Sequence, residues 1–275
     1  MTNGSWSCTG FLIAPNTVLT AAHCFLDLAN VDYLHRKPGD VVVKDNPKGV
    51  MVILGQASGY FSAEVQAKIT QQKNMCKAHP TTCSRQNSPA KSLADISRVT
   101  GGQAHFVSAI KMVRNTLKTD HLAVDYALLT LSTPAKAIAP VKVAGLSVKM
   151  PAEDWMKKSP YLRSLGYGRT QPDSTTVPQF LQEIPISIVD IDSRYFYGHG
   201  YKKGQSVCMG DSGGPLILVG ATAADDVVVG INDLGETNTW RLAQGYNNDT
   251  SHPCTGMSVF YRTDNITRTM NSSFG

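Results

Sequence analysis

Residues 210–215 read Gly-Asp-Ser-Gly-Gly-Pro, a stretch that sets one hydroxyl group, that of Ser212, among glycines. Glycine permits the tight turn that brings neighbouring backbone N–H groups to one point, where they can stabilise an oxyanion. A serine is a weak nucleophile unless an imidazole takes its proton and a carboxylate orients that imidazole. Ser212 is therefore a candidate nucleophile, and the N–H groups of Gly210 and Ser212 are a candidate oxyanion hole.

Two upstream segments supply an imidazole and a carboxylate. His23 lies in Thr-Ala-Ala-His-Cys at 20–24, and Asp125 begins Asp-Tyr-Ala-Leu-Leu at 125–129. A lone histidine is more often structural than catalytic, and Asp125 alone could cap a strand. A catalytic role for each of them is favoured because the motifs around His23, Asp125 and Ser212 occur together. Chymotrypsin-type triads have the order His, Asp, Ser, whereas subtilisin-like chains and α/β-hydrolases have other orders.

The three motifs together resemble the chymotrypsin/trypsin-fold serine endopeptidases. Residues 165–170, 181–189 and 229–231 are also similar to barrel strands of that family. The resemblance implies an all-β fold of two six-stranded antiparallel β-barrels, with the active site in the cleft between them and a short closing helix at 263–274. It further implies a serine endopeptidase with His23, Asp125 and Ser212 as catalytic residues. The alternative is an inert homologue that acts as a binding or regulatory module.

The chain divides into two strand-rich halves. We expect a first domain of residues 1–136, with a long insertion at about 55–119, and a second domain of residues 137–275. A helical turn or loop is expected at 190–197. Short apolar runs predict strands at 11–13, 18–20, 41–43, 50–54, 125–131, 161–167 and 184–188.

The region 31–120 is basic, with 13 Lys or Arg against 6 Asp or Glu. Such a surplus could steer an anionic partner towards the site. It contains no run of basic residues longer than the pair Arg36-Lys37, which favours a solvated surface loop.

An even number of cysteines, six, favours disulfides and an oxidising compartment, against the alternative of buried free thiols in a cytosolic protein. The resemblance implies the pairs Cys8–Cys24 and Cys208–Cys254, and with them Cys76–Cys83. We therefore expect a secreted or periplasmic protein whose signal sequence lies upstream of Met1, together with a propeptide.

Other function classes lack their sequence signals. No apolar stretch reaches the ~18 residues that a membrane-spanning helix needs. The chain shows no HExxH or paired histidines, no GxxxxGK[ST] and no basic run interleaved with aromatic residues. We expect no metal, no cofactor, no nucleic acid and no membrane span. The expected partners of this monomer are polypeptide substrates and proteinaceous inhibitors.

The resemblance also implies a specificity pocket. Ser206, six residues before Ser212, would form its floor, and Asp233, Leu234 and Gly235 would lie along one wall. Because Ser206 carries no charge, we expect a preference for uncharged, medium or large apolar side chains rather than Arg or Lys.

Two acidic residues raise further expectations. The family's counterpart of Asp211 pairs with a newly cut N-terminal amine, yet only seven residues precede Cys8, so either the chain starts upstream or Asp211 has another partner. Asp233 stands where the family has a serine against the triad carboxylate. It would bring a second carboxyl group to Asp125, with one proton held between them. The alternative is that Asp233 turns outward or meets a cation.

Overall fold

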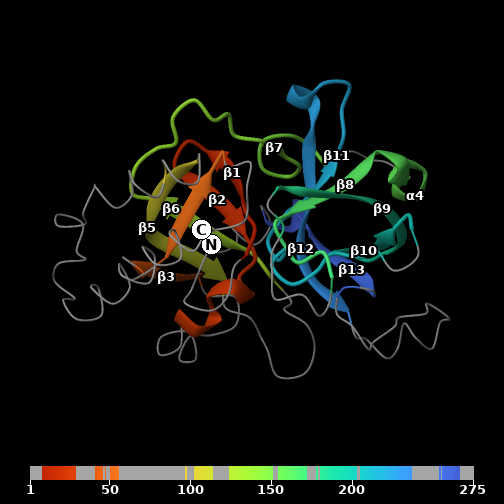
Figure 1. Ribbon diagram of the computed structural model, residues 1–275, viewed down its shortest axis with the longest axis horizontal. Helices are drawn as coiled ribbons and strands as arrows, with labels where there is room; N and C mark the ends of the chain where they lie inside the picture. The colour runs from red at the N-terminus through yellow and green to blue at the C-terminus, as the bar shows by residue number, and fades with distance from the viewer. Residues whose placement is uncertain are drawn as a thin grey trace.

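The computed structural model contains two β-sheets that lie side by side, the first half of the chain in one and the second half in the other (Figure 1). The structure describes residues 8–28, 41–45, 47, 50–55, 97, 102–113, 124–150, 154–171, 178, 180–202, 205–236, 254 and 256–266.

The first sheet has six strands in the order β1-β2-β6-β5-β3, with β4 also paired to β5. All of its pairings are antiparallel. Among the described residues β1 and β3 are not paired to each other, so the sheet is a half-barrel. Its strands are β1 (Phe11–Ala14), β2 (Thr17–Thr20), β3 (Val41–Asp45), β4 (Met51–Leu54), β5 (Gln103–Val113) and β6 (Ala127–Leu131).

The second sheet runs β11-β8-β9-β10-β13-β12-β7, and a further pairing of β11 with β12 closes six of these strands into a barrel. Its strands are β7 (Lys142–Val143), β8 (Leu162–Gly166), β9 (Gln182–Ile191), β10 (Tyr195–Gly200), β11 (Pro215–Leu218), β12 (Val227–Glu236) and β13 (Met257–Arg262). Strand β7 pairs with β12 in parallel, unlike the rest. The short helices are η1 (His23–Leu28), α4 (Trp155–Lys158), η2 (Ser159–Tyr161) and η3 (Ala223–Asp225). The predicted all-β, two-barrel fold is confirmed.

Alternation of side chains along β1, β2 and β6 explains how the two sheets meet. Leu12, Val18 and Leu129 face the core of the first sheet. Phe11 and Leu19, one residue away along their strands, join a second cluster that also contains residues of β10, β11, β12 and β13. Successive strand residues point to opposite faces, so one set of strands serves both clusters. Full burial of a side chain such as Leu19 stabilises this arrangement by about 1.5–3 kcal/mol.

Three sequence expectations need correction or fall partly outside the described residues. Residues 103–113, placed in the insertion, form β5, which pairs with β3, β4 and β6. Of the helical turn or loop expected at 190–197, only residues 192–194 lie between β9 and β10, in a tight turn where Asp192 accepts hydrogen bonds from the N–H groups of Arg194 and Tyr195. Of the expected closing helix, residues 264–266 are helical and 267–274 lie outside the described residues.

Candidate active site

His23 follows strand β2 and Asp125 precedes its neighbour β6, so both residues lie at the same end of the sheet. Strand β2 ends at Thr20 opposite Ala127, the first residue of β6, and the two strands are antiparallel. Asp125 Oδ2 lies 2.7 Å from His23 Nδ1, and Asp125 Oδ1 accepts the backbone N–H of His23 at 2.9 Å. The Asp125 side chain is fully buried, whereas that of His23 keeps 17% of its surface exposed. The carboxylate therefore fixes the imidazole through two separate hydrogen bonds.

The charges of these two residues support each other. Burial alone would raise the pKa of Asp125, but the charge and hydrogen bonds of His23 outweigh burial and hold that pKa below its ordinary value. Burial also opposes protonation of His23, yet the adjacent Asp125 carboxylate raises the His23 pKa above its ordinary value of 6.5. Asp125 is thus an ionised acceptor, and His23 is a strengthened base.

The loop that carries Ser212 packs closely on the segment that ends at His23. The N–H of Thr9 donates to Ser212 O at 2.9 Å. Gly213 has φ of 79°, in the left-handed region, and a Cβ there would overlap Thr20 Oγ1 and lie 2.6 Å from the backbone nitrogen of Ala21. Only glycine permits this approach, which brings Ser212 next to the turn that holds His23.

The N–H groups of Gly210 and Ser212 are available for an oxyanion. Around them, the N–H groups of Asp211, Gly213 and Gly214 donate to backbone carbonyls. Those of Gly210 and Ser212 have no protein acceptor among the described residues. Gly210 adopts φ of 101°, which a side chain would disfavour. The oxyanion hole formed by these two N–H groups remains a prediction.

Thr9 is a residue of this site that sequence reasoning missed. Its buried hydroxyl donates to the carbonyl of Gly210 at 2.9 Å and accepts the N–H of Tyr167 at 3.2 Å. Its own carbonyl accepts the hydroxyl of Thr20 at 2.7 Å. Thr9 therefore links the nucleophile loop to the strand that leads to His23. No sequence signal identifies it, because its partners are mostly distant backbone groups.

Asp211 finds backbone partners on both carboxylate oxygens. Oδ1 accepts the N–H of Gly168 at 2.7 Å, and Oδ2 accepts the N–H of Cys208 at 2.8 Å. Burial raises the pKa of Asp211 to about 6, although these two hydrogen bonds act in the opposite direction. In the described part of the chain these two amides hold the Asp211 carboxylate, while residues 1–7 lie outside that part.

Asp233 of β12 lies beside the His23–Asp125 pair. Its Oδ1 is 3.8 Å from His23 Nδ1, and the residue is 4% exposed. One carboxylate oxygen of Asp233 and one of Asp125 lie within 4.8 Å of each other. Asp233 does not turn outward to solvent.

Two buried hydroxyl groups meet where the pocket floor is expected. Ser206 Oγ lies 3.0 Å from Ser258 Oγ, which also accepts the N–H of Val207 at 3.2 Å. Gly235 is the strand partner of Ser258, and the side chain of Leu234 is outside the described residues. The structure identifies Ser258 as the residue that faces Ser206.

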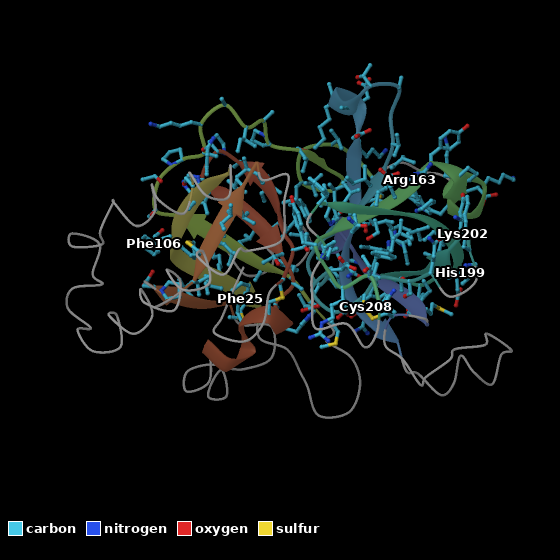
Figure 2. The ribbon with its side chains drawn as sticks, viewed as in Figure 1. Phe25, Phe106, Arg163, His199, Lys202 and Cys208 are labelled. Atoms are coloured by element: carbon cyan, nitrogen blue, oxygen red, sulfur yellow. A yellow bond between two sulfur atoms is a disulfide. The ribbon has the colours of Figure 1, made fainter. Side chains whose placement is uncertain are left out.

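Two of the expected disulfides are present, Cys8–Cys24 and Cys208–Cys254, while Cys76 and Cys83 lie outside the described residues. Cys24 precedes Phe25 of η1, and Cys208 lies in the other half of the molecule, before Ser212 (Figure 2).

Two described groups gather three potential metal ligands within 4.8 Å: Cys8, His23 and Cys24, and His23, Asp125 and Asp233. The sulfurs of the first are joined in a disulfide and offer no thiolate. In the second, His23 Nδ1 is engaged by Asp125. Neither arrangement presents a set of free ligands.

Comparisons with known proteins give matches to a sequence family and to a relative. The sequence profile of the family described as Trypsin matches residues 1–60 and 80–250. Glucanase inhibitor protein 1 of Phytophthora sojae is 32% identical over 124 residues, which are 42% of this chain and 45% of that protein. The chain thus matches less than half the length of this relative.

Among solved structures, neuropsin, a serine protease expressed in the limbic system of mouse brain, has a similar fold, with a TM-score of 0.51 and 18% identity. The likeness covers 98% of this chain and 89% of neuropsin. No helix in the described part of the chain is long and apolar enough to span a membrane.

Proposed function

The chain belongs to the trypsin family, and we propose that it is a serine endopeptidase that hydrolyses peptide bonds through an acyl-enzyme intermediate. The observation that carries the proposal is the double hydrogen bond from His23 to the buried Asp125, next to the loop of Ser212. Because the Nδ1–H of His23 donates a hydrogen bond to Asp125, Nε2 is the unprotonated nitrogen that can accept a proton.

In this mechanism His23 takes the proton of Ser212 as Oγ attacks the carbonyl carbon of the scissile bond. The N–H groups of Gly210 and Ser212 stabilise the oxyanion, and Asp125 stabilises the imidazolium. His23 then donates its proton to the leaving amine, and the acyl group stays on Ser212. A water molecule, deprotonated by His23, repeats the attack and releases the acid.

The uncharged floor supports a preference for uncharged side chains at the cleaved position. Ser206 and Ser258 carry neutral hydroxyl groups, which lie 3.0 Å apart, so neither offers a negative charge to Arg or Lys. A peptide library is expected to show cleavage after medium or large apolar residues. Cleavage dominated by Arg or Lys would contradict this assignment.

The two disulfides support a secreted or periplasmic location, since such bonds persist in oxidising compartments. We also propose that the domains are residues 1–136 and 137–275, that the protein is a monomer, and that its partners are polypeptide substrates and proteinaceous inhibitors.

A second candidate function is that of an inert homologue that binds another protein. The observation that favours it is the similarity to a relative named as a glucanase inhibitor. A fluorophosphonate probe separates the two candidates, because it reacts only with an activated serine. The endopeptidase predicts labelling at Ser212 that is lost in S212A and H23A. No labelling of folded wild-type protein would favour the binding module.

A further inference from the structure

The mechanism above leaves one buried acid without a role. Asp233 Oδ1 lies 3.8 Å from His23 Nδ1, on the side of the imidazole where Asp125 Oδ2 already lies at 2.7 Å. The side chain of Asp233 is 6% exposed and that of Asp125 is fully buried, so little water separates the two carboxyl groups. One oxygen of each carboxyl group lies within 4.8 Å of one oxygen of the other.

A hydrogen bond between two carboxyl groups requires a proton on one of them, because an ionised carboxylate is only an acceptor. Two carboxylates at close range in a poorly hydrated place also resist being ionised together. Asp125 and Asp233 together therefore carry one negative charge and one proton.

Asp125 is the better place for the charge. It accepts hydrogen bonds from both the backbone N–H and the ring Nδ1–H of His23, at 2.9 and 2.7 Å. Each of these bonds stabilises the ionised form. Asp233 Oδ1 is too far from Nδ1 for a hydrogen bond at 3.8 Å.

We propose that Asp233 is a positioning residue that keeps its proton at neutral pH and donates it to Asp125 in a hydrogen bond. The inference rests on the proposed function of the His23 site. In this role Asp233 holds the orienting carboxylate without adding a second negative charge. A second charge beside His23 would favour the imidazolium and so remove the general base.

Among the described residues, the titratable groups close to Asp233 include His23 of η1, Asp125 before β6 and Tyr195 of β10. Burial raises the pKa of Tyr195, and the negative charge that Asp233 and Asp125 hold between them raises it further, with Tyr261 adding to this effect and Arg194 opposing it. Tyr195 therefore stays a neutral phenol throughout the working range and adds no charge to the cluster.

The test is an NMR titration of the His23 ring in the wild-type chain and in D233N. Asparagine keeps the size and a donor but cannot ionise. If Asp233 is neutral, D233N leaves the pKa of His23 within about 0.5 pH unit of the wild-type value. If Asp233 is ionised, D233N removes a negative charge and lowers that pKa by about 1–3 pH units, and a fall above about 0.5 would overturn the proposal.

The double variant D125N/D233N is the positive control, because it removes both carboxyl groups and is expected to lower the pKa of His23. The titration needs no turnover. It therefore reports the protonation state of Asp233 even if the protein cleaves no peptide. Failure of the proposed function is detected separately, by the absence of probe labelling at Ser212.

Infrared spectroscopy keeps the proposal testable if D233N does not fold. At about pH 8, above the pKa of about 6 of Asp211, the wild-type chain labelled at aspartate with ¹³C is expected to retain the C=O stretching band of a protonated carboxylic acid. Absence of that band would overturn the proposal. Loss of the band in D233N or D233S assigns it to Asp233.

Discussion

Replacing Asp125 with asparagine is expected to trap His23 in the wrong tautomer. Oδ1 of Asp125 accepts the backbone N–H of His23, and this N–H can only donate. The amide oxygen of the asparagine must therefore take the Oδ1 position, which turns its NH₂ group towards Nδ1. Nδ1 then has to accept, the ring proton moves to Nε2, and His23 cannot take the proton of Ser212.

The loss should be large, because two effects combine. A triad with the wrong tautomer loses about 10⁴ in kcat, which corresponds to about 5 kcal/mol of transition-state stabilisation. The imidazolium also loses the charge that lies 2.7 Å from Nδ1. Neither effect concerns the substrate pocket, so KM should change little.

The assay is steady-state hydrolysis of a peptide substrate by wild type, D125N, D233N and D125N/D233N. D233N serves as the matched control, since it makes the same chemical change at the neighbouring carboxyl group and should retain most activity. The double variant prevents Asp233 from taking over as acceptor. A kcat within about tenfold of wild type in folded D125N/D233N would refute the tautomer argument.

Three further outcomes follow from the site. T9V removes the hydroxyl that holds the nucleophile loop and should lower kcat about tenfold, whereas T17V, at an exposed hydroxyl, should not; equal rates would contradict this. Because the pKa of His23 is raised and the base must be neutral, kcat/KM should fall as pH drops through a value above 6.5, and a limb below it would be inconsistent. G213A should lose activity and about 1–3 kcal/mol of stability through strain and overlap with Thr20, and an unchanged Tm and kcat would argue against that packing.

The proposed catalytic residues could be located from sequence because each lies in a short motif whose neighbours serve the same purpose. Gly213 is an example, since the glycine that follows Ser212 is required by the close approach to Thr20. The small residues before His23 are buried, with Ala21 and Ala22 at 0% and 2% exposure. Local chemistry is visible in local sequence.

The remaining features depend on contacts between distant residues. Thr9 bonds to Gly210, 201 positions away, and nothing in its own neighbourhood indicates this. Strand β5 was hidden by a bulge, since its register shifts between Val107 and Ala109 and breaks the period-two alternation. Ser258 could not be assigned from sequence, because its position depends on the register of β12 against β13. That register shifts between Asn232 and Gly235.

The most direct test of the account is detection of the acyl-enzyme formed from a peptide substrate. The reaction is quenched with acid before steady state, and the protein is digested and mapped by mass spectrometry. The account predicts a mass increase equal to the acyl portion of the substrate on the fragment that contains Ser212, absent in S212A. Folded wild-type protein that cleaves no peptide bond, or that cleaves it equally well as S212A, would contradict the central claim.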